Sequence, residues 1–189
     1  LLTENGIPPV YFQSFLPGET DFRSLITKLR AARPEVIYIG IQAPDTAHLV
    51  LSQLHDLGLG SLKIFGNELM GNAVYLAGSK VHLYEGLTFA EPDWNENAPL
   101  TRDFISRFKS RYKVDFLTYG MWNAEAYDAV MLLADVIGRC GEDVEKVKGC
   151  LHRVKDWTGA SGTFSIDRNG DGVRHYILKR IAGGKVLPL

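Results

Sequence analysis

Three short, mostly apolar runs separated by helical patterns constrain the fold of this chain more than any other feature. The runs are EVIYIG at 35–40, LKIFG at 62–66 and YEGLTFA at 84–90. Continuous apolar runs of this length are typical of strands that are buried on both faces of a parallel sheet. Strands that alternate with helices form βαβ units with right-handed crossovers. We therefore expect an α/β fold with a parallel sheet flanked by helices.

The helices around these strands follow from apolar residues at helical spacing. Pro44 is typical of the first position of a helix and opens the one after the first run. The stripe of that helix consists of Ala47, Val50, Leu51, Leu54 and Leu57. Upstream, PPVYFQSF at 8–15 predicts another strand, and Thr20 can cap the helix after it. A short helix is expected at 74–77.

The pattern changes in the second half of the chain. Three helices are expected, one starting near Leu100 and two more at 119–139 and 143–154, with apolar residues on one side of each. Strand-like runs then return as GTFSID, RHYILKRI and KVLPL. This change indicates that the chain leaves one lobe and later returns to it.

Composition excludes two classes of partner. The 189 residues are 46% hydrophobic and 23% charged, with a formal net charge of −1, so no basic surface for nucleic acid is expected. No apolar run approaches the roughly 20 residues of a spanning helix, so we expect no direct insertion into a membrane. The start, LLTENGIPPVYF, lacks a signal segment, and we interpret it as a helix end, a stop at Gly6 and a strand of a fragment whose upstream part is missing.

Two cysteines, Cys140 and Cys150, flank a predicted junction between two helices. Gly141 is expected to end the first helix and Asp143 to begin the second, so the two sulfur atoms can meet across a tight turn. Spacing alone does not separate a disulfide from two independent buried thiols. An even count in an exported protein favours the disulfide. A zinc site needs more ligands than the nearby sequence offers, and no metal site is expected.

The run DRNGDG at 167–172 resembles the opening of a calcium-binding loop. The twelfth position of such a loop needs a bidentate Glu, but Leu178 stands there. Asn-Gly and Asp-Gly pairs between strand-like runs are also a strong hairpin signal, because these residues tolerate positive φ. The hairpin turn is the favoured interpretation.

No cluster of residues indicates catalysis. His48 and His55 lie seven residues apart on one helix, about 10 Å along its axis, which is too far for a shared metal ion. We expect both on a solvated face. The nucleophile elbow, the P-loop and the common metalloprotease motif are absent, so we expect no enzymatic activity and no cofactor.

Glu68 is the notable charged residue in IFGNELMGNA at 64–73. It directly follows the third strand-like run counted from the N-terminus, and open α/β sheets bind ligands at the carboxyl ends of their strands. Gln42 stands at the equivalent place after the preceding strand. Glu68 either favours the start of a helix through the helix dipole or binds a ligand, and position alone does not decide. A binding role calls for a positively charged partner such as an ammonium group.

Five segments, taken in order, resemble one protein family. They are PGETDFRSLITKLRAARPEVIYIG, FGNELMGNA, YEGLTFAEP, WNAEAYDAVMLLADVI and GASGTFSIDRNGDGVRHYILKRIAGGKVLPL. Together they resemble the C-terminal half of a leucine/isoleucine/valine-type periplasmic binding protein, the substrate-binding component of a branched-chain amino acid ABC transporter. The resemblance implies a type I periplasmic-binding fold, in which two Rossmann-like lobes close on a ligand.

The resemblance also implies the organisation of the chain and the roles of its site residues. Residues 1–90 would form most of the second lobe without its first strand, 91–165 a helical segment belonging to the other lobe, and 166–189 the strands that cross back. Glu68 falls on the family's acidic residue for the α-ammonium of an amino acid. The family often has an aromatic residue at the position of Gln42. The amide of Gln42 favours a more polar ligand than an aromatic ring would. Trp122 either faces the cleft or lies in a core.

These implications predict an extracytoplasmic protein, periplasmic or extracellular, that captures an amino acid or a similar small zwitterion and delivers it to a membrane ABC permease. A ligand-sensing regulatory domain of the same fold, for an amide or an amino acid, is the alternative. An enzyme would need catalytic groups in the missing lobe.

Overall fold

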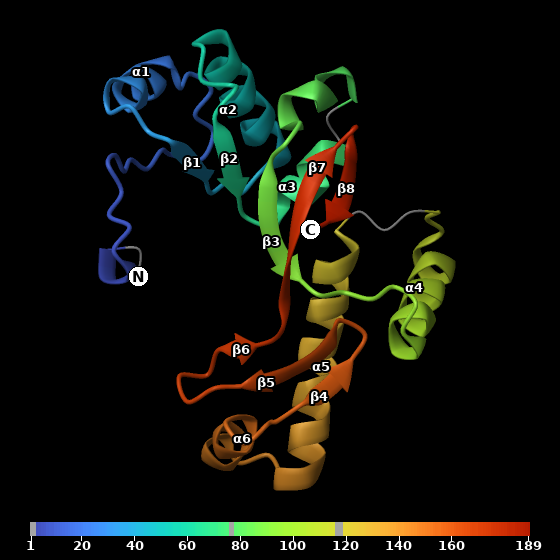
Figure 1. The fold of residues 1–189 in the computed structure, drawn as a ribbon. Coiled ribbons are helices and arrows are strands. Elements are labelled where there is room, and N and C mark those ends of the chain that lie inside the picture. Colours follow the sequence, from blue (N-terminus) through green and yellow to red (C-terminus); the bar gives the residue numbers. More distant parts are fainter. Residues whose placement is uncertain (1–2, 76–77, 116–118) are drawn as a thin grey trace. The chain divides into compact units, whose positions relative to one another are not determined.

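The computed structural model of the chain describes residues 3–75, 78–115 and 119–189. The chain forms two compact units, which are connected through β3 and β7 (Figure 1). Unit 1 comprises residues 1–91 and 177–189, and unit 2 comprises residues 92–176.

Unit 1 is built on a five-stranded sheet of order β1-β2-β3-β7-β8. Its strands are β1 Val36–Ile39, β2 Lys63–Gly66, β3 Thr88–Pro92, β7 Tyr176–Ala182 and β8 Lys185–Pro188. The first three are parallel neighbours, which confirms the parallel sheet expected from the apolar runs. The other two extend the sheet in antiparallel fashion. Gly86 N donates to Ile181 O at one end of the β3–β7 pair, and Asp93 N donates to His175 O at the other.

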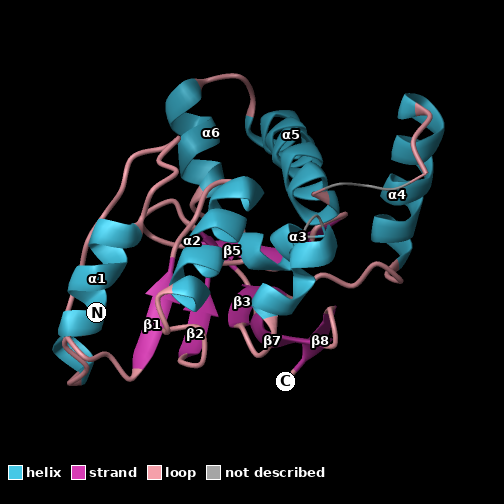
Figure 2. Cartoon of the chain, turned by 90° about the horizontal axis from the view of Figure 1, so that it is seen from above, coloured by secondary structure: helices cyan, strands magenta, loops and turns pink. Residues whose placement is uncertain are grey.

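Helices pack against this sheet and bury part of its apolar side chains. The helical elements of unit 1 are η1 Thr3–Asn5, α1 Arg23–Ala31, α2 Pro44–Asp56, α3 Leu69–Tyr75 and η2 Gly78–Tyr84. Helix α2 begins at Pro44 as expected, and it lies beside α3 on one face of the strands (Figure 2). The core includes Leu51 and Leu54 of α2 and Phe89 of β3. The short helix expected at 74–77 begins earlier, and residues 76 and 77 lie outside the described part.

The strand expected at 8–15 is wrong. The structure assigns no strand to these residues, and Val10 and Phe12 are 69% and 83% exposed. The sequence pattern fits a strand, but a strand also needs a hydrogen-bonding neighbour. Among the described residues, β1 pairs with β2 alone, and its other edge forms no ladder with this segment.

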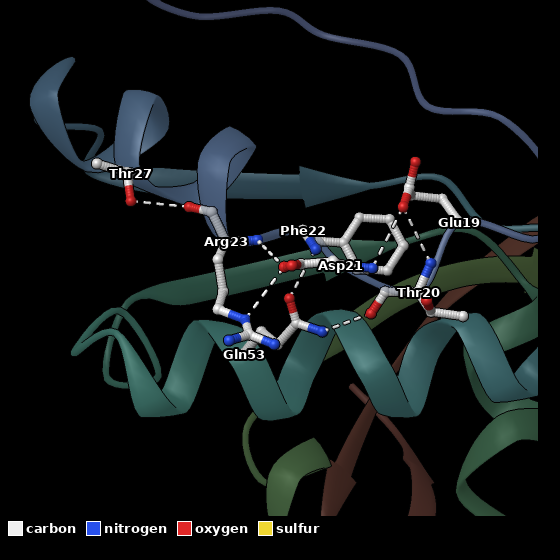
Figure 3. Close-up of polar contacts among 7 residues, drawn as sticks. All are labelled: Glu19, Thr20, Asp21, Phe22, Arg23, Thr27 and Gln53. Carbon is white, nitrogen blue, oxygen red and sulfur yellow. Dashed lines mark hydrogen bonds and ion pairs between the residues drawn. The ribbon is translucent and has the colours of Figure 1, made fainter.

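The cap expected from Thr20 is also wrong. Helix α1 begins after Phe22, which provides no side-chain cap. The Gln53 amide of α2 instead accepts from Phe22 N at 2.7 Å and donates to Thr20 O at 2.8 Å (Figure 3). Asp21 Oδ1 accepts from Arg23 N at 3.1 Å. The helix start is therefore held by a residue 31 positions away in sequence, which local patterns do not reveal.

Unit 2 contains the three expected helices and a small antiparallel sheet. The helices are α4 Pro99–Tyr112, α5 Gly120–Cys140 and α6 Val144–Leu151. The sheet strands are β4 Trp157–Gly159, β5 Gly162–Ile166 and β6 Gly172–Val173. Gly141 ends α5, and Asp143 caps α6 by accepting from Lys146 N, as predicted. Three-residue β4 was not predicted, because so short a strand shows no period.

A buried carboxylate holds the small sheet of unit 2 to α5. Asp128 is 1% exposed, and its two oxygens accept from Ala160 N at 2.8 Å and Ser161 N at 2.6 Å. Gly159 permits this approach, because a Cβ there would overlap the Asp128 carboxylate. The β4–β5 turn is thereby fixed against the helix, and Trp157 and Phe164 pack nearby on Leu132 and its neighbours.

Candidate functional site

The candidate site lies at the carboxyl edge of the parallel strands in unit 1. Strands β1 and β2 end at Ile39 and Gly66, which are register partners, so the loops after them leave the sheet side by side. The first loop carries Gln42 and the second carries Glu68. Open α/β sheets bind ligands outside this edge. The structure thus places both residues on adjacent loops, while their contact with a ligand stays a prediction.

A side-chain amide connects these two loops. Asn67 Nδ2 donates to Ile41 O at 2.9 Å, and Asn67 Oδ1 accepts from Ile41 N at 3.3 Å. Ile41 is only 3% exposed, so both bonds satisfy backbone groups that water does not reach. Sequence analysis did not identify Asn67. The only local signal is an amide side chain directly after a strand, which is too common to be diagnostic.

Helix α3 packs directly on the end of the sheet. This packing fixes the position of the backbone that carries Glu68. A Cβ on Gly66 would lie 2.5 Å from Met70 Cγ, and one on Gly71 would lie 2.8 Å from Phe89 Cζ. The two glycines therefore allow a close approach that larger residues would block. Met70 is fully buried beneath this contact. The backbone that carries Glu68 is consequently held by packing on one side and by Asn67 on the other.

The Glu68 side chain is half-buried and unpaired within the described residues. Its backbone oxygen accepts from Gly71 N at 3.1 Å, but its carboxylate has no hydrogen bond or ion pair with another described residue. Lys179 of β7 forms its ion pair with Glu91 of β3. Gln42 is exposed, and its amide likewise has no partner in the described part of the chain. These two side chains are available for a ligand.

Trp122 lies on α5 in unit 2. It is half-buried, and its ring centroid lies 5.4 Å from that of Tyr119. Tyr119 precedes the helix and has a positive φ of 60°, in the left-handed region that few side chains adopt. The aromatic pair packs at the helix start. A ligand contact of Trp122 stays a prediction.

The expectation that His48 lies on a solvated face is wrong. His48 of α2 is 7% exposed, and its Nδ1 forms a hydrogen bond with the hydroxyl of Tyr84, which is fully buried. Burial lowers the pKa of His48, and the charge of Lys80 lowers it further, while Asp45 opposes this. The sequence carried a signal, since His48 precedes Leu51 by one helical turn. His55, near the helix end, is exposed as expected.

The turn after β5 is a hairpin turn, as favoured from the sequence. Strands β5 and β6 pair in antiparallel fashion around it. Asp167 Oδ1 accepts from Asn169 N at 2.8 Å and from Asp171 N at 2.9 Å. The hydrogen bond from Asp171 N is the largest cause that lowers the pKa of the Asp167 carboxyl. That oxygen therefore organises the turn.

Cys140 and Cys150 form a disulfide across the α5–α6 turn. Within the described residues, no group of three or more His, Cys, Asp or Glu side chains has the arrangement of a metal site. None of the described helices combines the length and apolar character needed to span a bilayer.

A groove lies on the surface of unit 2. It has a volume of about 440 Å³ and lies between α4 and α5, where Phe108 and Tyr127 supply aromatic rings and Arg107 and Arg111 supply charge. Arg107 is already engaged, by an ion pair with Asp103 at 2.7 Å and a hydrogen bond to Tyr127. The groove is open, and none of the residues that line it carries an acidic side chain that could pair with an ammonium group. The sheet edge of unit 1 remains the better candidate.

Comparison with protein families gives one match over nearly the whole chain. The family described as periplasmic binding protein matches residues 1–185. A Leu/Ile/Val-binding protein homologue of Brucella melitensis is 31% identical over 172 residues, which cover 90% of this chain and 45% of that protein. The leucine-, isoleucine-, valine-, threonine- and alanine-binding protein of Pseudomonas aeruginosa is 31% identical over 169 residues, covering 88% and 43%.

Solved structures show the same architecture. The leucine-binding protein LivK of Thermotoga maritima superposes with a TM-score of 0.74 at 27% identity, over 93% of this chain and 49% of that one. The chain therefore spans less than half the length of these relatives. The matched family is one of binding proteins and not of enzymes, which confirms the expectation of a non-enzymatic chain.

Proposed function

The chain belongs to the periplasmic binding protein family, among the Leu/Ile/Val-binding proteins, and we propose that it helps to capture an amino acid or a similar small zwitterion for import by an ABC transporter. The observation that carries this proposal is the half-buried Glu68 carboxylate, which has no cationic partner among the described residues. In the proposal, the α-ammonium group of the ligand is that partner.

The physical argument rests on desolvation. A carboxylate that is partly removed from water loses hydration and is stabilised by a cation that approaches it. The competing role, a favourable charge at the start of α3, contributes about 0.3–1 kcal/mol and needs no ligand. A capping Glu68 would accept from a backbone N–H of α3 through its side chain, and no such bond is formed among the described residues. The free carboxylate favours the binding role.

Gln42 is proposed to contact the side chain of the ligand. An amide offers one acceptor and two donors, so it tolerates an apolar side chain and adds a hydrogen bond to a polar one. The named ligands of the Pseudomonas aeruginosa relative include threonine as well as the branched aliphatic amino acids. We propose the same breadth for this chain, with small polar amino acids bound at least as well as leucine.

The proposed assembly uses two lobes. Residues 1–90 would supply most of the second lobe, residues 91–165 the part that belongs to the other lobe, and residues 166–189 the strands that cross back. The lobe that closes over the ligand would add its own contacts, and Trp122 would face the cleft from α5. Closure of two lobes around a ligand is a hinge motion driven by contacts to both. The protein would act in the periplasm or outside the cell and deliver its ligand to a membrane permease.

An NMR titration of the 189-residue chain tests the proposal, because NMR detects even weak binding. The carboxyl ¹³C signal of Glu68 is followed at about pH 6.5, where an α-amino group is protonated. L-Leucine and L-leucinamide, which both carry the ammonium group, are expected to shift this signal. 4-Methylpentanoate has the same carbon skeleton without the ammonium group and is expected to leave the signal unchanged. The proposal would be overturned if the Glu68 signal does not shift with leucine, or if it shifts equally with 4-methylpentanoate.

A further inference from the structure

We infer that Asn67 is the positioning residue of the proposed site, and that its amide holds the loops of Gln42 and Glu68 together before any ligand arrives. The part of this inference that concerns ligand binding rests on the proposed function. The two bonds between the Asn67 amide and the Ile41 peptide run in opposite directions, one donated and one accepted. Such a pair fixes both distance and orientation, as a single bond does not.

The covalent chain carries this constraint directly to the two proposed ligand contacts. Gln42 is bonded to Ile41, and Glu68 is bonded to Asn67. Neither the Gln42 nor the Glu68 side chain has another partner among the described residues that would hold it. A site held in its binding geometry loses less conformational entropy when the ligand binds. The amide of Asn67 therefore sets how well the free protein is prepared for the ligand.

The Asn67 amide connects two loops, although an asparagine at this place in the chain could instead cap helix α3. Asn is among the strongest N-cap residues, because its side-chain oxygen accepts from a backbone N–H of the first helical turn. Helix α3 starts at Leu69, and the backbone oxygen of Asn67 does accept from Met70 N at 3.1 Å. Its side chain, however, turns to Ile41. Helix capping therefore does not explain the side chain, and the connection of the two loops does.

The chain offers a matched control in the second amide of this kind. Gln53 accepts from Phe22 N and donates to Thr20 O, so it also joins two segments of unit 1 through one backbone donor and one backbone acceptor (Figure 3). It touches neither the Gln42 loop nor the Glu68 loop through these bonds. Replacing Gln53 changes stability by the same kind of loss without altering the link at the site.

Asn67→Asp gives a variant whose link depends on pH. An ionised carboxylate introduced at position 67 has no proton to donate to Ile41 O and repels that oxygen, so the paired link opens, whereas a protonated carboxyl donates and accepts like the amide. The requirement for a donor and the partial burial both favour the protonated form and raise the pKa of the introduced group. The link is thus present below this raised pKa and is lost as pH rises through it. Gln53→Glu undergoes the same change at the control position.

The test measures loop order and leucine binding by NMR in the wild-type chain, Asn67→Asp, Asn67→Ala and Gln53→Glu, at about pH 5 and about pH 8. In the wild type, the amide of Ile41 is expected to exchange much more slowly than an unprotected amide at the same pH, at both pH values. In Asn67→Asp, we expect fast exchange of Ile41 and at least tenfold weaker L-leucine binding at the higher pH, with both restored to within about threefold at the lower pH. Asn67→Ala loses both at each pH, and Gln53→Glu changes neither.

Two results would overturn the inference. One is an Asn67→Asp chain that keeps the wild-type exchange of Ile41 and wild-type binding at the higher pH. The other is a loss that is equal at both pH values, which would indicate a general structural role. If the wild-type chain itself fails to bind leucine, the proposed function fails, and the exchange of Ile41 in the variants still decides whether Asn67 holds the loops. If Asn67→Asp does not fold, the same exchange measurement in Asn67→Ala decides.

Discussion

The hydroxyl of Tyr84 and the Nδ1 atom of His48 form a hydrogen bond inside unit 1, between η2 and α2. Neither residue is accessible, with Tyr84 at 0% and His48 at 7% exposure. Burial raises the pKa of the Tyr84 hydroxyl far above its usual range, so this group stays a neutral donor or acceptor. The pair ties the helix after β1 to the segment before β3, and it supports the same strands that carry the candidate site.

Removing one partner of this bond is expected to destabilise the fold. Tyr84→Phe leaves His48 Nδ1 buried without its partner, and an unsatisfied buried polar group costs about 1–3 kcal/mol. Urea unfolding of the wild type and the variant measures this loss. Tyr38→Phe, at an exposed tyrosine of β1, is the matched control and is expected to change stability little. Equal stability of Tyr84→Phe and the wild type would contradict the account of the pair.

The lowered pKa of His48 gives a defined pH dependence. A histidine whose pKa is lower in the folded state binds its proton more readily when unfolded, so stability is highest above the ordinary value of about 6.5 and falls as pH drops below it. Unfolding free energies measured between about pH 8 and pH 5 check this slope. His48→Gln is expected to flatten it, whereas His55→Gln, at the exposed histidine of the same helix, is expected to leave it unchanged. Identical slopes for the two variants would refute the assignment.

The buried Asp128 carboxylate is expected to be essential for the stability of unit 2. Asp128→Asn replaces one accepting oxygen by an NH₂ group that faces a backbone N–H, at a cost of about 2–4 kcal/mol. Thermal and urea unfolding measure this cost. Asp135→Asn makes the same chemical change at an exposed position of α5, where the carboxylate only pairs with Arg139 one turn on, and is expected to alter stability by less than about 0.5 kcal/mol. Comparable losses at both positions would show that the two backbone bonds are unimportant.

The disulfide is expected to stabilise the α5–α6 junction. It closes a short loop, with a sequence separation of 10, and loop-closure entropy predicts a contribution of about 2–3 kcal/mol. The Cys140→Ser/Cys150→Ser chain is compared with the wild type by urea unfolding without reductant. Adding dithiothreitol to the wild type should reproduce the loss and leave the double variant unchanged. Two reactive thiols in the native wild-type chain would contradict the assignment.

The hairpin turn at Asp167 is expected not to bind calcium. Its carboxylate oxygen is engaged by two backbone N–H groups, which lower the pKa of Asp167. A carboxyl whose pKa is lower in the folded state stabilises the fold when the pH is above the pKa of the unfolded state. This contribution disappears as the pH falls through the pKa of the folded state. An NMR titration is therefore expected to place the pKa of Asp167 below the usual value of about 3.9. A calcium-dependent rise in Tm would show that the turn binds this ion.

The sheet of unit 1 was predictable from the sequence wherever burial determined the pattern. The runs that became β1, β2 and β3 are continuous and apolar, as is typical of strands in a parallel sheet, although β1 leaves Val36 and Tyr38 exposed on one face. PPVYFQSF at 8–15 has a similar pattern but forms no strand, because pairing depends on a neighbour that local sequence does not specify. His48 was misjudged for a related reason: its helical position pointed inward, but only Tyr84, 36 residues away, makes its burial favourable.

The candidate site was predictable in part. A carboxylate directly after a buried parallel strand indicated Glu68, and the same reasoning indicated Gln42, because the edge of a parallel sheet is set by strand order. Asn67 was not predictable, since its role depends on a bond to the backbone of a loop 26 residues away. Contacts between side chains and distant backbone groups leave no periodic trace in a sequence, and the three-dimensional structure is needed to reveal them.

The most direct test of the central claim compares Glu68→Gln with Glu35→Gln in L-leucine binding. The two variants remove the same charge, but Glu35 is exposed before β1, at the opposite end of that strand from Gln42. Loss of the carboxylate that pairs with the ammonium group is expected to weaken binding at least tenfold, about 1.4 kcal/mol, in Glu68→Gln alone. Unchanged affinity in Glu68→Gln, or an equal loss in Glu35→Gln, would contradict the proposal that Glu68 binds the ligand.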